Sequence, residues 1–177
     1  MELVEEVRAA VYATANAEYA AWVEHAGGLD LAPLKVQGLP LEAWVVSPRA
    51  ARPPVGVLLV RVGETLVVTT GDAAAAARVL AGAQVADDAL PGVLFELLRS
   101  RARPMGMVTA DLSGAPMGAR PPAVTRVDGA VVVRLCVTRG ALPPEAWSLT
   151  WTPSSPGSTA TLRWTREPLA DAGGTAP

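Results

Sequence analysis

Two side chains that commonly do acid–base or nucleophilic chemistry at neutral pH occur once each in this sequence, as His25 and Cys136. Histidine is the usual general base, and a cysteine thiolate is a strong nucleophile and metal ligand. A zinc site needs three or four ligands, and the sequence has no C-x-x-C, H-E-x-x-H or EF-hand spacing. We therefore predict that neither residue is catalytic or metal-bound.

Cys136 has two interpretations. Arg134 lies two positions before it, on the same face of a predicted strand, and a guanidinium can activate a thiol. A lone cysteine in an apolar strand is more often a small core residue. We expect the second role.

Phosphate-binding and Schiff-base chemistry also lack their usual parts. The turn that starts at Gly71 opens a helix, but no further glycines and no Lys-Ser or Lys-Thr pair follow it. The only lysine, Lys35, lies in a connection rich in proline and glycine. We expect a protein without a cofactor that is not an enzyme.

The N-terminal segment from Glu2 to about Ala26 contains no proline or glycine and predicts one long helix that ends at a Gly-Gly pair. Glu18 and His25 fall on its apolar stripe, two turns or roughly 10 Å apart, which is too far for a direct acid–base pair. Glu18 and the neighbouring Trp22 remain candidates for binding a partner.

Charge is unevenly distributed along the chain. The first 48 residues hold seven acidic residues against Arg8 and Lys35, whereas residues 90–140 hold seven arginines against three acidic residues. A basic middle segment could attract an acidic partner, and the candidates are Arg99, Arg101 and Arg103. The same arginines could simply offset the negative end of a helix dipole.

Composition limits the class of protein. The 177 residues fit one domain, and the apolar fraction of 50% with 18% charged residues excludes a disordered chain. The longest apolar runs have the length of a strand, so we expect no membrane span. A single cysteine and an acidic N-terminus favour a cytoplasmic location, and arginine in place of lysine favours a bacterial, GC-rich genome.

Two helices and two hairpins are predicted from local signals. Gly63-Glu64 joins strands 55–62 and 65–70, whose two faces are both apolar, so we place this hairpin centrally in a sheet. Asp72 is a good N-cap for a helix over Ala73–Ala81, and a second helix is predicted over Pro91–Arg101. Asp128-Gly129 predicts a tight hairpin between strands 123–127 and 130–138.

The remaining predicted strands are Leu41–Ser47, at a sheet edge, and 105–112, 147–152 and 159–165. Strand alternation puts Trp147, Trp151 and Trp164 on one apolar face, which we expect to pack inward. Exposed tryptophans beside Arg163 and Arg166 could instead stack on single-stranded nucleic acid, but the pI of about 5.4 and the single lysine argue against nucleic acid as a partner.

We predict an α+β fold: one antiparallel sheet of about six to eight strands, with a long N-terminal helix and two short helices packed on it. Residues 1–166 would form a single domain, and residues 167–177 a flexible tail. From the first hairpin to the second, the order of elements resembles the sensor folds PAS, GAF and roadblock. The resemblance covers order alone, includes no motif residues and assigns no family.

The expected function is a non-enzymatic interaction or scaffold module that forms a homodimer through sheet or helix faces, because a sheet with two apolar faces gains from a partner. A protein partner of another kind is the further possibility. The alternative function is a sensor-type domain that binds a small molecule in an apolar pocket between sheet and helices, lined by Met105, Met107, Phe95 and the tryptophans.

Overall fold

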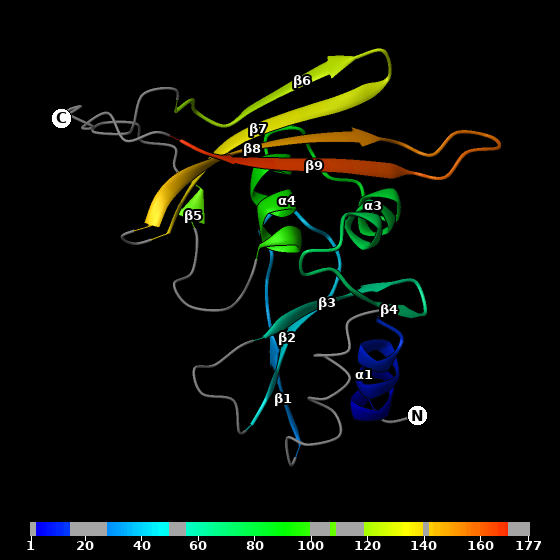
Figure 1. The fold of residues 1–177 in the computed structure, drawn as a ribbon. Helices are drawn as coiled ribbons and strands as arrows, with labels where there is room; N and C mark the ends of the chain where they lie inside the picture. The colour runs from blue at the N-terminus through cyan, green and yellow to red at the C-terminus, as the bar shows by residue number, and fades with distance from the viewer. Residues whose placement is uncertain are drawn as a thin grey trace.

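The computed structural model describes residues 3–14, 28–49, 56–99, 107–108, 119–139 and 142–169. In these ranges the chain forms three helices and nine strands, arranged in two antiparallel sheets (Figure 1). The fold class is α+β, as predicted. The single sheet of about six to eight strands is wrong.

The first sheet has the order β1-β2-β3-β4, with β1 over Leu29–Pro33, β2 over Ala43–Pro48, β3 over Val57–Val62 and β4 over Thr65–Val68. Val62 pairs with Thr65 across the predicted hairpin turn, where Gly63 has a φ of +59°. A positive φ at the first turn residue alone fits the expected type II′ geometry. The hairpin is not central, because β4 lies at the sheet edge.

Strand β2 was predicted at an edge but lies inside the first sheet, since β1 pairs with its outer side from Leu29↔Pro48 to Pro33↔Trp44. On sequence alone, residues 29–54 are predicted to form a connection broken by Pro33, Gly38 and Pro40, with Leu41–Ser47 as its one strand. Backbone pairing with β2 stabilises a strand of only five residues that local patterning does not predict.

Two helices follow the first sheet. The helix α3 (Ala73–Ala81) begins as predicted at Asp72, whose side chain accepts a hydrogen bond from the Ala75 amide at 2.9 Å. The helix α4 (Leu90–Leu98) ends three residues before the predicted Arg101. Apolar side chains cover α4 on nearly every side, and seven of its nine residues are buried. A helix of this kind needs packing partners all round it.

The second sheet contains β5 (Met107–Val108), β6 (Ala123–Val127), β7 (Ala130–Arg139), β8 (Leu142–Thr152) and β9 (Thr161–Pro168). Its order is β5-β7-β8-β9, and β6 pairs with the same edge of β7 as β5 does. The Asp128-Gly129 hairpin is confirmed, with φ of +49° and +78° at its two turn residues. Strand β9 continues to Pro168, two residues beyond the predicted domain boundary.

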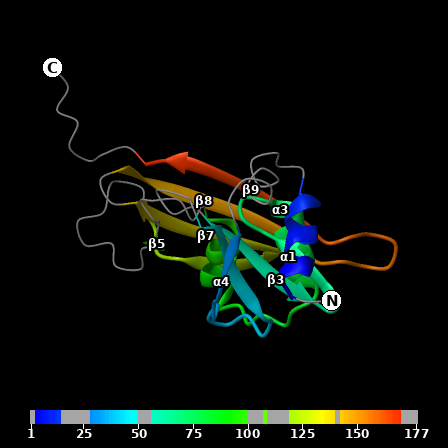
Figure 2. The same cartoon turned by 90° about the horizontal axis from the view of Figure 1, so that it is seen from below.

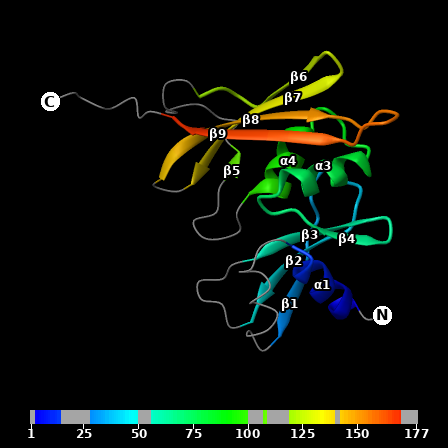
Figure 3. The ribbon, with the colours of Figure 1, turned by 45° about the vertical axis from the view of Figure 1, so that its right-hand side comes forward.

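The helices α3 and α4 lie between the two sheets (Figures 1 and 3). One buried cluster joins Leu58, Val60 and Val67 of the first sheet, both helices, and the inward side chains of β7 and β8. The alanines of α3, of which Ala75, Ala76 and Ala77 are fully buried, fit the space between the layers. The helices therefore divide the strands into two sheets, each with one face on this core.

The N-terminal helix α1 (Leu3–Tyr12) covers the opposite face of the first sheet, where Val7 and Val11 pack with Val57, Leu59 and Val68. The predicted helix to Ala26 is not confirmed. After Tyr12 the chain turns, and the Thr14 hydroxyl donates to the Val11 carbonyl at 2.8 Å, an alternative to the helical bond. Residues 15–27 lie outside the described ranges.

Both apolar faces of the β3–β4 hairpin are thus covered within the chain, by α1 on one side and by α3 and α4 on the other. The sequence argument for a homodimer rested on incomplete cover of these faces. That argument does not hold for this hairpin.

The predicted inward packing of the tryptophans is confirmed. Trp147 is 1% exposed, and Trp151 and Trp164 pack against the same core. The Trp147 ring lies 5.6 Å from Phe95 of α4 and 4.9 Å from Trp164, measured between ring centroids. Its Nε1 donates to Glu145 Oε2 at 2.8 Å, an oxygen that also accepts from Arg139 at 3.2 Å. The indole N–H is therefore satisfied at the edge of the core.

We expect Trp147→Ala to lower the free energy of unfolding by about 3–5 kcal/mol, because it removes a fully buried aromatic ring. Urea unfolding measures the change. Leu142→Ala, on the same strand but 51% exposed, is the control and should stay within about 0.5 kcal/mol of the parent. A similar loss in both variants would show that Trp147 does not anchor the core.

Gly82 follows α3 with a helical φ of −87°, so its backbone does not require glycine. A Cβ at this position would lie 2.6 Å from Val62 Cγ1 of β3. We expect Gly82→Ala to destabilise the fold by about 1–3 kcal/mol through this overlap. In contrast, Gly92→Ala in α4 meets open space and should add up to about 1 kcal/mol of stability in thermal unfolding. Stabilisation by Gly82→Ala would mean that α3 and β3 are less tightly packed.

Candidate functional site

The candidate site lies on the second sheet, on the face directed away from α3 and α4, here called the outer face. Two neighbouring rows of cross-strand pairs form its floor. Arg134 of β7 pairs with Ser148 of β8, which pairs with Thr165 of β9. The next row is Cys136, Ala146 and Glu167. Because side chains alternate along each strand, these residues point away from the tryptophan core.

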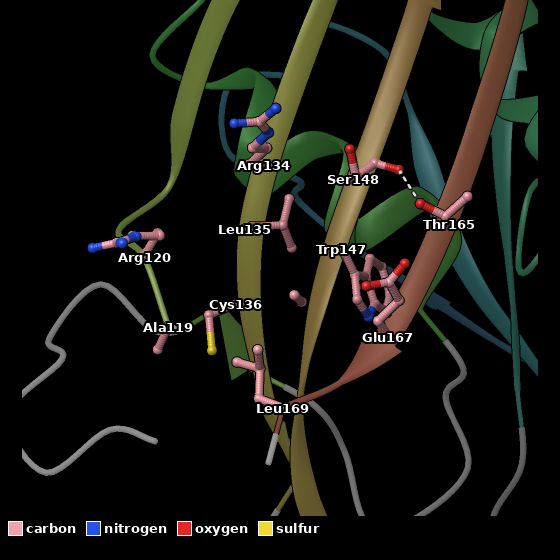
Figure 4. A pocket seen from close by; sticks show the side chains of 11 residues that line it. Ala119, Arg120, Arg134, Leu135, Cys136, Trp147, Ser148, Thr165, Glu167 and Leu169 are labelled. Atoms are coloured by element: carbon pink, nitrogen blue, oxygen red, sulfur yellow. Dashed lines mark hydrogen bonds between the residues drawn. The ribbon is translucent and has the colours of Figure 1, made fainter. Parts of the chain in front are cut away.

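Small side chains in the middle of these rows leave a hollow between longer ones. The result is a pocket of about 210 Å³ (Figure 4). Its lining comes from all three strands and from the segments beside them: Ala119, Arg120, Arg134, Leu135, Cys136, Ala146, Trp147, Ser148, Thr165, Glu167 and Leu169. This volume is below the roughly 300–1,000 Å³ of sites for drug-sized ligands, so the pocket suits a smaller molecule.

Cys136 is 2% exposed although it belongs to the outer face. Ala119 and Leu169 lie beside its thiol in Figure 4. Leu169 is held there by its amide, which donates to the Pro144 carbonyl at 2.7 Å. Burial raises the pKa of the Cys136 thiol, because the charged thiolate loses hydration. The nearby Arg134 does not activate it, and the expected role as a small buried residue fits this environment.

Charged groups occupy opposite sides of the pocket. Arg120 and Arg134 lie on the side of β6 and β7, and Glu167 lies on the side of β9 (Figure 4). All three side chains are exposed, and none has an ion-pair partner among the described residues. Six other described arginines form ion pairs, among them Arg126 with Asp87 and Arg139 with Glu145, whereas Arg78, Arg163 and Arg166 do not. The pocket therefore combines an uncharged floor with unpaired charge at its rim.

The second feature of the site is the free edge of β9, which forms one wall of the pocket. β9 pairs only with β8 among the described strands, and it runs along the outside of the second sheet in Figures 2 and 3. The edge is eight residues long. An unpaired edge of this length exposes backbone donors and acceptors that another strand can bind.

Of the site residues predicted from sequence, Arg99 lies within the described ranges, and it is not part of this pocket. Arg99 follows α4, forms an ion pair with Glu96 at 3.0 Å and lies over the Phe95 ring, 5.4 Å from its centroid. It is 13% exposed, so it acts at the core boundary. The other candidates, Arg101, Arg103, Glu18 and Trp22, lie outside the described residues, as does His25.

The predicted apolar pocket between sheet and helices had Phe95 and the tryptophans in its lining. Of that predicted lining, Phe95 and Trp147 pack against each other in the core. The pocket described above is a different one, on the outer face. Met105 and the side chain of Met107 are outside the described part. Sequence analysis missed the outer-face residues because pairing across β7, β8 and β9 is needed to bring them together.

A second, more open hollow lies where α4 begins, between Asp87, Asp88, Pro91 and Val124. Asp87 is already engaged, since both its oxygens accept from Arg126, at 3.1 and 2.6 Å. This pairing raises the pKa of Arg126. The Arg126–Asp87 pair ties β6 to the start of α4, which is a structural role.

Within the described ranges, no three His, Cys, Asp or Glu side chains gather as metal ligands would. None of the helices described is long and apolar enough to cross a membrane. Comparison of the chain with protein-family models, with curated proteins and with solved structures finds no match. The function is therefore inferred from the residues of the outer face and of the β9 edge.

We expect Cys136 to react slowly with iodoacetamide in the folded protein. A raised pKa leaves less thiolate at any given pH, and burial limits access. The rate should reach half its maximum above the pH of about 8.5 that is usual for cysteine. The urea-unfolded protein is the control, and Cys136 is the sole thiol in the chain. Equal rates in the two states would contradict the buried placement.

Proposed function

We propose that this protein is a non-enzymatic interaction module that forms a homodimer by pairing β9 of one copy with β9 of another. The observation that supports the proposal is the self-complementary charge pattern along the free edge of β9. The pairing would join two second sheets into one continuous sheet, a mode of association known as β-augmentation.

Of the edge strands described, β9 suits this role best. β1 and β6 have five residues each, β4 has four and β5 has two, against eight in β9. β1 ends in a proline, and short strands or prolines are common ways to block unwanted edge pairing. β9 has its proline only at the last position, Pro168.

A two-fold axis through Thr165 gives a specific register. Two antiparallel copies of β9 then place Arg163 opposite Glu167 of the partner subunit, and the same pair recurs on the other side of the axis. Thr165 faces its own copy, and all these side chains lie on the outer face. Directly opposed charges of opposite sign and paired threonines both favour antiparallel pairing.

The inner face fits the same register. Trp164 would lie opposite Arg166 of the partner subunit, a cation–aromatic combination that also occurs within the chain, where Arg166 Cζ lies 5.7 Å from the Trp164 ring centroid. Exposed ion pairs contribute at most about 1 kcal/mol each, so they select the register while backbone hydrogen bonds and aromatic contacts supply most of the affinity. Pairing along one strand involves few residues, so we expect a weak dimer with a dissociation constant on the order of micromolar.

Charge reversal tests the register. Arg163→Glu places two like charges opposite each other twice in the dimer, and Glu167→Arg does the same with the opposite sign. We expect each single variant to raise the dimer dissociation constant by roughly tenfold or more. The double variant R163E/E167R restores opposite charges and should return the constant to near the parent value. Sedimentation velocity over the micromolar range measures all four proteins.

Lys35→Glu is the matched control, because it makes the same change of charge at an exposed residue between β1 and β2. It should dimerise like the parent. A parent protein that stays at 18.2 kDa at all concentrations would contradict the proposed function. A dimer that ignores the single reversals would contradict the register.

A further inference from the structure

We propose that the outer-face pocket binds a small monocarboxylate with a short apolar body. The pocket combines two features that this class of ligand requires: a floor of small, uncharged side chains and a rim with unpaired guanidinium groups.

The floor is suited to a short hydrocarbon chain. Cys136, Ala146 and Leu169 contribute apolar surface, and the raised pKa of the thiol keeps Cys136 uncharged at neutral pH. The hydroxyls of Ser148 and Thr165 are part of the same lining, and Thr165 already donates to the Ser148 carbonyl at 3.4 Å (Figure 4). A ligand body of a few carbons can cover this floor without burying a charge.

The rim selects the sign of the ligand. Arg120 and Arg134 supply two permanent positive charges on the β6–β7 side of the pocket, where Figure 4 shows both side chains extending outward from the floor, and neither forms an ion pair with a described carboxylate. Guanidinium groups bind carboxylates through paired, charge-assisted hydrogen bonds, which orient the ligand as well as attract it. A carboxylate at this side leaves its apolar body free to extend over Cys136 and Ala146.

Glu167, on the opposite side, would disfavour an anion in the isolated chain. In the proposed dimer it faces Arg163 of the partner subunit, which compensates its charge. This part of the inference rests on the proposed function, and it predicts that the ligand and the second copy favour each other's binding. Binding to Arg120 and Arg134 does not itself depend on the dimer.

The test uses hexanoate as the probe and calorimetry on the full chain at constant ionic strength. We expect one site per chain with a dissociation constant on the order of 0.1–1 mM, since so small a ligand makes few contacts. Hexylamine and hexanol, which share the chain but lack the carboxylate, should bind at least tenfold more weakly. Hexanoate should also slow alkylation of Cys136, which reports directly on occupancy of the pocket.

Two variants locate the site. Ala146→Phe fills the floor and should weaken hexanoate binding at least tenfold, and Arg134→Gln should weaken it by about three- to tenfold. Thr150→Phe is the control: Thr150 lies on the same strand and face, two rows from Ala146, and outside the pocket lining. It should bind hexanoate within twofold of the parent. Circular dichroism confirms that each variant is folded.

Absence of hexanoate binding, or binding that Ala146→Phe leaves unchanged, would overturn the inference. Stronger binding of hexylamine or of a zwitterionic amino acid would overturn it too, because Glu167 would then be the recognition group. Dimerisation is measured separately without ligand. A monomeric parent that binds hexanoate defeats the proposed function alone, whereas a dimer that does not bind it defeats the pocket alone.

Discussion

The structure depends on one constraint, the need to cover α3 and α4 with apolar surface on two sides at once. Seven of the nine residues of α4 are buried, and α3 has a run of fully buried alanines. A helix layer of this kind cannot lie on one sheet with its other side in water, because the exposed apolar area would cost too much free energy. The first sheet covers one side of the layer and the second sheet covers the other. The small alanine side chains fit α3 between them, and Gly82 lets β3 approach.

The same constraint leaves the outer face of the second sheet without a core to support. Inward side chains of β7, β8 and β9 supply the tryptophans, leucines and valines of the core, while alternate positions carry cysteine, alanine, serine and threonine between charged residues. Sheets with one solvated face commonly alternate in this way. Here the solvated face also has a hollow with two unpaired arginines beside it, and a long free edge. These features are the reason that we propose binding at this face.

Local chemistry predicted the turns, caps and faces of this protein well. The turns at Gly63 and at Asp128-Gly129 have the positive φ values that their residue types favour. Asp72 caps the Ala75 amide at the start of α3. Strand alternation directs the tryptophans inward. The division into two sheets was not predictable in the same way. An apolar strand face is compatible with a helix layer that covers a single sheet, and equally with a helix layer that lies between two sheets. The candidate site was missed for a related reason. Its residues are distant in sequence, and the complementarity of Arg163 with Glu167 has meaning only once β9 is known to lie at an edge.

Pairing of β9 with a second copy is the central claim, and a designed disulfide tests it most directly. Thr165 is the residue that would face its own copy, at a Cα separation of about 4.5–5.5 Å, which a disulfide can span. In a Cys136→Ala background, the account predicts that Thr165→Cys forms a covalent dimer rapidly under mild oxidation. Thr161→Cys at the start of the same strand should form little, since it would face residue 169 of the partner instead. Failure of Thr165→Cys to cross-link, or equal cross-linking at both positions, would contradict the account.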